Sequence, residues 1–325
     1  MSANSEAADE VCASCGKAEV DNIKLRRCTA CKLVRYCSVD CQKEHRSQHK
    51  RTCKKRASEI RDDLLFTLPD STCFDDCSIC CLPVPIEREK STMFMCCCQI
   101  ICNGCQFTNF RHEQKEGIEV SMCPFCREPD DGTDEEKQKA FMERIKANDL
   151  NALRRMGTKY FLEGDYKKAF EYHTKAAQLG DASAHYELSV MYYEEKGLKN
   201  DKKKIRHHLE EAAIKGHPIA SHNLGCNEER AKGWTERAKK HYIIAAKLGY
   251  IPSMRRVKDA FDWGAVSEED YSATLRGHEA TVNATKSSQR EQSYAYDNLV
   301  QKLRSGRFEG EEKERMINEL QEMVR

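Results

Sequence analysis

Eighteen of the 19 cysteines lie between Cys12 and Cys126, and only Cys226 lies beyond them. From Cys77 to Cys126 there are three Cys-x-x-Cys pairs, and a run of three adjacent cysteines separates the first pair from the second. A Cys-x-x-Cys pair presents two thiolates at a spacing that suits tetrahedral zinc, and two such pairs complete a closed site of four ligands. This stretch therefore predicts zinc binding.

The segment before it carries a second set of metal-binding residues. Its ligands pair as Cys12 with Cys15, Cys28 with Cys31, Cys37 with Cys41, and His49 with Cys53. Eight ligands predict two closed, structural zinc sites without an open position for a substrate. A segment this short buries too little apolar surface to fold alone. Metal binding must therefore supply most of its folding free energy, on the order of 10 kcal/mol per ion.

Disulfides are the competing explanation for so many cysteines. The first ten residues, MSANSEAADE, lack the apolar core of a secretory signal, and no apolar run approaches the roughly 20 residues that span a bilayer. We therefore expect an intracellular protein, cytoplasmic or nuclear, where thiols stay reduced and zinc is favoured over disulfides. The net charge of +1 argues against a chain that binds nucleic acid along its whole length.

The run LRRCTACKLVRYCSVDCQKEHRSQHKRTC and its ligand spacing resemble a MYND zinc finger over residues 12–53. The resemblance implies interleaved sites, with Cys12, Cys15, Cys37 and Cys41 on one zinc and Cys28, Cys31, His49 and Cys53 on the other. It favours His49 over His45, because His49 stands at the family's position four residues before the last cysteine. MYND fingers bind short, often proline-rich peptides. Arg46 and Ser47 replace the Trp-Pro pair common in the family, so the usual peptide groove is a weaker expectation.

This finger is strongly basic. Residues 24–56 hold 12 Lys or Arg against two acidic residues. Such a density could contact phosphates, and KRTCKKR could act as a nuclear import signal. No aromatic residues alternate with the charges as a base-stacking surface requires, so a solvated basic face is favoured and nucleic acid is not expected as a partner.

The later cysteines are similar to a RING finger over residues 77–127. The resemblance implies one zinc on Cys77, Cys80, Cys102 and Cys105, and a second on Cys97, Cys123 and Cys126 with one further ligand. The fourth ligand should stand three residues before Cys102, where this chain has Gln99. Either Cys96 or Cys98 must substitute, or the second site is incomplete. We favour Cys98, which lies nearest to the expected place.

RING fingers hold a ubiquitin-conjugating enzyme with its loaded ubiquitin in a reactive geometry, which is catalysis by orientation. The resemblance assigns contacts to Ile79 between the first two ligands, Pro124 between the last two, Phe110 on the intervening helix, and Arg127 directly after the last ligand. The same residues would also shape a zinc knuckle without such activity. Two functions are favoured: a RING-type ubiquitin ligase that recruits targets through its other modules, and a non-catalytic scaffold. A transcription-linked adaptor that uses the basic finger is a third, less favoured function.

From about residue 150 the sequence repeats. Similar segments begin at Ala152, Ala184, Ala220 and Ser253, with spacings of 32, 36 and 33 residues. Ala-Ala pairs followed by glycine recur with matching spacing at positions 176, 212 and 245. Small residues let paired helices approach closely, and glycine ends a helix. Since no single pair buries its apolar face, the pairs must stack into a solenoid. The segment resembles Sel-like repeats, relatives of the tetratricopeptide family, which implies binding of a peptide or partner protein.

The expected fold is mainly α, with two small zinc-stabilised cross-brace modules followed by an α/α solenoid of helix-pair repeats. The expected segments are a disordered leader at 1–11, the MYND-type finger at 12–53, a helical linker at 54–72, the RING-like finger at 73–130, a charged linker at 131–149, the repeats at 150–285 and a charged helical tail at 286–325. An amphipathic stripe in the tail, including Met316 and Leu320, could pack on the last repeat or on a partner helix. The order of modules resembles multi-domain zinc-finger proteins of algae and diatoms.

Overall fold

The computed structural model describes residues 11–20, 22–129 and 132–324, apart from the side chain of residue 134. The chain forms two compact units, and the boundary between them lies after Thr67. Residues 1–10 of the predicted leader lie outside the described residues. Val11, at the end of that leader, pairs with Ala18 in an isolated β-bridge.

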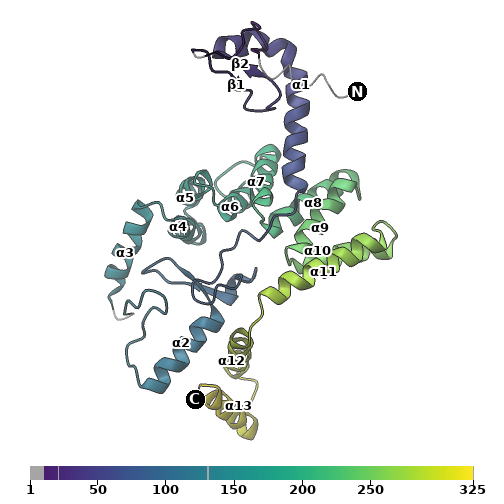
Figure 1. Ribbon diagram of the computed structural model, residues 1–325. Helices are drawn as coiled ribbons and strands as arrows, with labels where there is room; N and C mark the ends of the chain where they lie inside the picture. Colours follow the sequence, from purple (N-terminus) through teal and green to yellow (C-terminus); the bar gives the residue numbers. More distant parts are fainter. Residues whose placement is uncertain (1–10, 21, 130–131, 325) are drawn as a thin grey trace. The chain divides into compact units, whose positions relative to one another are not determined.

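The first unit contains a two-stranded antiparallel sheet of β1 (Arg26–Arg27) and β2 (Arg35–Tyr36), followed by the long helix α1 (Val39–Phe66) (Figure 1). Ser38 caps α1, because its hydroxyl accepts a hydrogen bond of 3.1 Å from the backbone N–H of Cys41. The buried core consists of Cys12, Cys28, Cys31 and Tyr36. Three of these four residues are predicted metal ligands, so little apolar surface stabilises this unit apart from the ligands themselves.

The second unit begins with the central cysteine module (residues 73–129). It contains the short 3-10 helix η2 (Arg88–Lys90), the antiparallel strands β3 (Ser91–Met93) and β4 (Ile100–Cys102), and helix α2 (Asn103–Glu116). Gly117 ends α2 in the left-handed conformation, with φ of 66°. Its buried core contains Cys77, Val84, Ile101, Cys102 and Cys105. Strand β4 leads directly into α2, which places Cys102 and Cys105 at one end of the helix.

A series of helices follows, and the fold class predicted from the sequence is confirmed. The bounds are α3 (Asp134–Lys146), α4 (Leu150–Glu163), α5 (Tyr166–Gln178), α6 (Ala182–Tyr193), α7 (Lys202–Ile214), α8 (Pro218–Lys232), α9 (Glu236–Lys247), α10 (Ile251–Asp262) and α11 (Glu268–Ala284). Helix α4 packs on α5, α6 on α7, and α8 on α9, and each pair also contacts the next. Figure 1 shows these helices stacked one after another along the chain.

The glycines of the repeat permit close contact between paired helices. A Cβ atom at Gly157 in α4 would lie 2.8 Å from the ring of His173 in α5. A Cβ atom at Gly225 in α8 would lie 3.0 Å from the ring of Tyr242 in α9. In each pair, therefore, a large ring of one helix occupies the space that a side chain of the other would need.

The tail forms α12 (Ser288–Arg304) and α13 (Gly310–Val324). Both helices pack on α2 of the central cysteine module and on each other. Met316, from the predicted amphipathic stripe, is buried. The sequence suggested the last repeat or a partner helix as the surface for this tail, whereas the structure shows contacts with α2. Within the described ranges, every helix is too short or too polar to cross a bilayer.

Candidate metal centres

The structure gathers the predicted ligand residues into groups whose ligand atoms lie within 4.8 Å of one another. Among the residues that the structure describes, the four groups are Cys12, Cys15, Cys37 and Cys41; Cys28, Cys31, His49 and Cys53; Cys77, Cys80, Cys102 and Cys105; and Cys96, Cys97, Cys123 and Cys126. Zinc–sulfur bonds of about 2.3 Å in a tetrahedron place the sulfurs about 3.8 Å apart. The donor types and their proximity therefore fit zinc.

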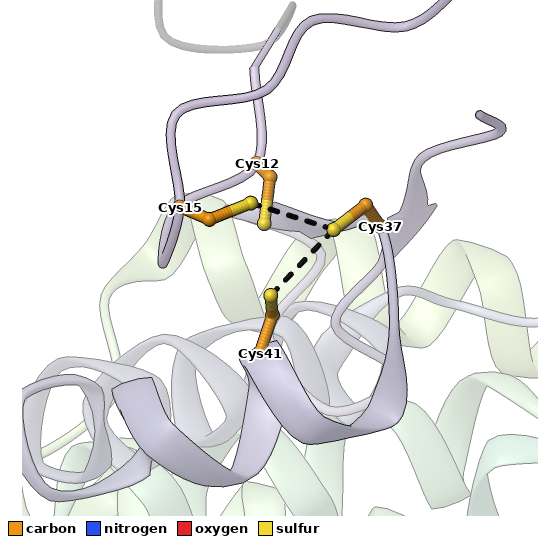
Figure 2. Close-up of side chains that lie close together, drawn as sticks. All are labelled: Cys12, Cys15, Cys37 and Cys41. Atoms are coloured by element: carbon orange, nitrogen blue, oxygen red, sulfur yellow. Dashed lines mark hydrogen bonds between the residues drawn. The ribbon is translucent and has the colours of Figure 1, made fainter.

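The first group connects the segment before β1, which carries Cys12 and Cys15, with Cys37 directly after β2 and Cys41 in α1. Figure 2 shows the thiols of Cys12, Cys15, Cys37 and Cys41 pointing toward one another. The sulfur of Cys37 lies 3.5 Å from those of Cys15 and Cys41. Burial raises the pKa of Cys12, but backbone N–H groups, first that of Cys15, outweigh burial and lower this pKa to about 6. The backbone thus favours the thiolate, which is the form that binds metal.

The second group lies between the sheet and the middle of α1. His49 is buried, and its Nε2 atom lies 3.2 Å from the sulfur of Cys31. The sulfur of Cys28 lies 3.7 Å from that of Cys53. His45 is outside this group, because its Nδ1 atom lies 3.1 Å from the hydroxyl of Tyr36. Its ring stacks on His49 with centroids 5.6 Å apart, so His45 supports the orientation of the histidine in the group.

The third group holds the base of α2 to the loop at Cys77. The sulfur of Cys80 lies 3.9 Å from that of Cys102, and the backbone N–H of Cys102 donates to the sulfur of Cys77 over 3.3 Å. A side-chain hydrogen bond with Cys102 outweighs burial and lowers the pKa of Cys77 to about 4. This group is the most buried of the four.

Sequence reasoning missed a cation beside this third group. Arg290 of α12 is only 1% exposed, and its Nη2 atom lies 3.6 Å from the sulfur of Cys80. Its guanidinium also donates to the backbone oxygens of Leu82, Pro83 and Thr285. A zinc ion with four thiolates carries a net negative charge, so a buried guanidinium provides compensation. Arg290 and Cys80 are 210 positions apart in the sequence. The sequence around Arg290 contains no motif from which this contact could be predicted.

The fourth group corrects the sequence-based preference for Cys98. The sulfur of Cys96 lies 3.5 Å from that of Cys126, and the sulfur of Cys97 lies 3.8 Å from that of Cys123. Cys98 adopts a left-handed conformation with φ of 56°, which directs it away from this group. Its side chain packs with Phe141 and Leu153 in the core of the solenoid. Burial raises the pKa of Cys98 to about 12, as is usual for an inert thiol.

The structure brings together only some of the predicted contacts for a conjugating enzyme. Phe110 and Pro124 line the same hollow of about 390 Å³. Ile79 is 41% exposed and Arg127 is also exposed, but neither lines that hollow. The Nη1 atom of Arg127 donates to the side-chain oxygen of Asn109 over 3.4 Å.

Two further residues shape this surface and were not anticipated. Glu113 is buried, and its carboxylate accepts hydrogen bonds from Asn109, Ser121 and the backbone N–H of Met122. These contacts fix the loop before Cys123 against α2. The ring of Tyr296 in α12 packs at a tilt against that of Phe107, with centroids 4.9 Å apart, and its centroid lies 6.3 Å from that of Phe110. The tail therefore covers part of the α2 face that carries Phe110.

Comparison with known families identifies residues 12–53 as similar to the MYND finger, which confirms the resemblance found in the sequence. The match spans the first two ligand groups. Among solved structures, a Sel1 repeat protein from Oxalobacter formigenes is 26% identical, with a TM-score of 0.36, and the match covers 38% of this chain and 98% of that one. A protective antigen of uropathogenic Escherichia coli that displays an SLR fold is 17% identical, with a TM-score of 0.36, and the match covers 57% of this chain and 38% of that one.

Proposed function

We propose that this chain is a protein-interaction protein organised by four zinc ions, two in residues 12–53 and two in the central cysteine module. The observation that supports this is the presence of four complete donor groups, each with four ligand atoms in mutual proximity. All four lack an open coordination position, so zinc acts structurally and shapes binding surfaces. We also infer a reducing compartment, cytoplasm or nucleus, because the ligand thiols must stay reduced.

The first finger offers a surface for a peptide. A hollow of about 420 Å³ lies beside the second ligand group, and Tyr36, Gln42 and Arg46 are among its lining residues. Its lining includes Cys28, His49 and Cys53 of the second ligand group and further residues of α1 as far as Ala57, so zinc binding would hold it in shape. MYND fingers generally bind peptides, and we assign that activity to this hollow.

We further propose that the central cysteine module acts as a RING-type ubiquitin ligase. Ile79, Phe110 and Pro124 would dock the conjugating enzyme, and Arg127 would bridge that enzyme and ubiquitin. The shared hollow of Phe110 and Pro124 and the exposure of Arg127 support this assignment. The solenoid and the first finger would then recruit targets.

The test is discharge of ubiquitin from a panel of loaded conjugating enzymes by the full chain. Wild-type protein should accelerate the discharge of ubiquitin from at least one of these conjugating enzymes. Arg127→Ala should reduce that rate by roughly tenfold, about 1.4 kcal/mol of transition-state stabilisation, with unchanged zinc content. Lys115→Ala, an exposed cation at the end of α2, serves as the matched control. No acceleration across the panel would remove the ligase assignment.

A second function, that of a non-catalytic scaffold, is favoured by one observation. Tyr296 of α12 packs on Phe107 and lies close to Phe110, so the chain's own tail occupies part of the surface that a conjugating enzyme would need. A scaffold predicts that no enzyme is discharged while target binding and zinc content are retained. The discharge assay therefore separates the two functions.

A further inference from the structure

The solenoid contains an extended hollow where α7 begins and α8 ends. One part has a volume of about 670 Å³ and is bordered by Tyr193, Ile205, Leu224 and Arg230, among others. A neighbouring part of about 580 Å³ lies over the loop between α6 and α7. Both parts share Asn200, Lys202 and Lys203 in their lining, so they form one continuous depression, here called the basic groove.

Positive charge dominates the lining of the basic groove. Its cations are Lys199, Lys202, Lys203, Lys204, Arg206, Arg230 and Lys232. Its two carboxylates already have partners. Asp201 accepts from the backbone N–H groups of Lys203 and Lys204, and Glu228 accepts from Arg206 and Arg237. Within the described part of the chain, no ion pair involves Lys202, Lys203 or Arg230, all of which are exposed.

Three of these cations occupy an unfavourable position. Lys202, Lys203 and Lys204 form the first turn of α7, where the helix dipole is positive and acidic residues are favoured. Helices α9 and α11 carry acidic residues in their first turns, whereas the first turns of α4, α5, α6, α8 and α10 carry none. The first turn of α7 contains no acidic residue. A bound carboxylate would interact favourably with both the lysines and the helix end.

The floor of the groove is apolar. Ile205 and Leu224 are buried beneath it, and Tyr193 is 61% exposed at its edge. An aliphatic side chain between acidic residues would match this combination of apolar floor and basic rim. A single nucleic-acid strand would need successive aromatic rings for stacking, and Tyr193 is the one exposed aromatic residue among those that line the groove.

We propose that the basic groove binds a short acidic peptide segment of a partner protein, with carboxylates at the first turn of α7 and an aliphatic side chain over Leu224. This inference rests on the proposed function, in which the solenoid recruits partners, and it specifies their chemistry. Because charge attracts the ligand, binding weakens as ionic strength rises.

The experiment measures fluorescence anisotropy of labelled synthetic peptides with the full chain. One peptide contains Asp, Glu and a central Leu, a second replaces the acids with Asn and Gln, and a third replaces Leu with Ser. Single-stranded DNA of similar length is the fourth probe. We expect the acidic peptide with leucine to bind most tightly. The affinity of each of the other two peptides should be lower by about tenfold or more.

Two variants locate the site. Lys203→Glu combined with Arg230→Glu should weaken binding of the acidic peptide by tenfold or more, roughly the effect of reversing two charge contacts. Lys167→Glu is the control, because Lys167 is an exposed lysine at the same position in the first turn of α5. Glutamate is favoured at a helix start, so helix α7 should remain folded in the double variant.

Several results would overturn the inference. These are equal binding of the acidic and amide peptides, tighter binding of DNA than of any peptide, or equal losses in the control and the double variant. Ubiquitin discharge by the double variant should match wild type, since neither residue belongs to the central cysteine module. Loss of peptide binding with normal discharge therefore tests the groove separately from the ligase.

Discussion

Cys96 and Cys98 are separated by one residue, yet their thiols occupy different environments. Cys96 lies 3.5 Å from the sulfur of Cys126 in the fourth ligand group, whereas Cys98 is fully buried among the apolar side chains of the solenoid. The left-handed backbone at Cys98 is responsible, because it turns the chain between Cys97 of the fourth ligand group and strand β4. Three adjacent cysteines carry no periodic signal that would show this turn, so the sequence left the choice of ligand open.

Serine substitutions distinguish the two thiols. Cys96→Ser should reduce bound zinc by one ion per chain, because serine is a poor zinc ligand and leaves the fourth group with three. Cys98→Ser should retain all bound zinc but destabilise the second unit by about 1–3 kcal/mol, since a hydroxyl replaces a thiol in an apolar core. Metal analysis and thermal unfolding provide the two measurements. The reverse pattern of zinc loss would reinstate Cys98 as the ligand.

His217 illustrates how single residues set the pH dependence of the solenoid. It is 1% exposed, its Nδ1 atom accepts a hydrogen bond from the backbone N–H of Ala220, and its ring stacks on Tyr186. Burial lowers the pKa of His217 to about 3, whereas a histidine in an unfolded chain titrates near 6.5. The folded state therefore holds this ring neutral where the unfolded state would protonate it.

The stability that this neutral ring provides is present above pH 6.5 and is lost as the pH falls toward 3. The decrease in the free energy of unfolding that is due to His217 should reach about 3 kcal/mol at pH 4. His217→Asn keeps a side chain able to cap α8 but cannot titrate. The difference in unfolding free energy between wild type and this variant should shrink as pH is lowered from 7 to 4, as followed by urea denaturation. A difference independent of pH would refute the argument.

Among the elements, α12 links the tail to the central cysteine module. Arg290 extends from α12 to the loop at Leu82 and to the third ligand group, and a Cβ atom at Gly104 would lie 2.7 Å from the backbone N of Arg290. Helices α2 and α12 therefore approach too closely for any side chain at Gly104. This packing explains why a tail that resembles an independent charged helix in the sequence belongs to the second unit.

Removal of Arg290 tests this link. Arg290→Ala leaves the third ligand group without its buried cation, and we expect a loss of about 3 kcal/mol in the stability of the second unit. Zinc should also be released more rapidly to a competing chelator, with one ion per chain affected. Arg304→Ala removes an exposed cation from the same helix and is the control. Equal release from both variants would show that Arg290 does not support the metal site.

The repeats were the most predictable elements, and the tail was the least. Paired alanines and glycines recur along the solenoid because every helix pair needs small residues where its two helices approach closely. The pattern is therefore visible in the sequence without a structure. Ala152, Ala184 and Ala220 are all fully buried, at equivalent places in α4, α6 and α8. The contact of Arg290 with Cys80 arises once, between distant segments, and no local pattern encodes such a contact.

At the scale of the whole molecule, two units with different sources of stability are joined in one chain. The first unit has a core of ligand thiols and Tyr36, whereas the second contains the large aliphatic and aromatic core of the solenoid. The ligand spacing in the sequence predicted all the residues of the first two groups. It did not establish how many ions the chain holds, because the count depends on the irregular fourth group.

The central claim is therefore tested by the zinc content of the purified full chain, measured by metal analysis against protein concentration. Four complete donor groups predict four zinc ions per chain. Three ions would show that the fourth group is not a metal site, and two would confine zinc to the first finger. Either lower value would contradict the account of the central cysteine module as a zinc-organised binding surface.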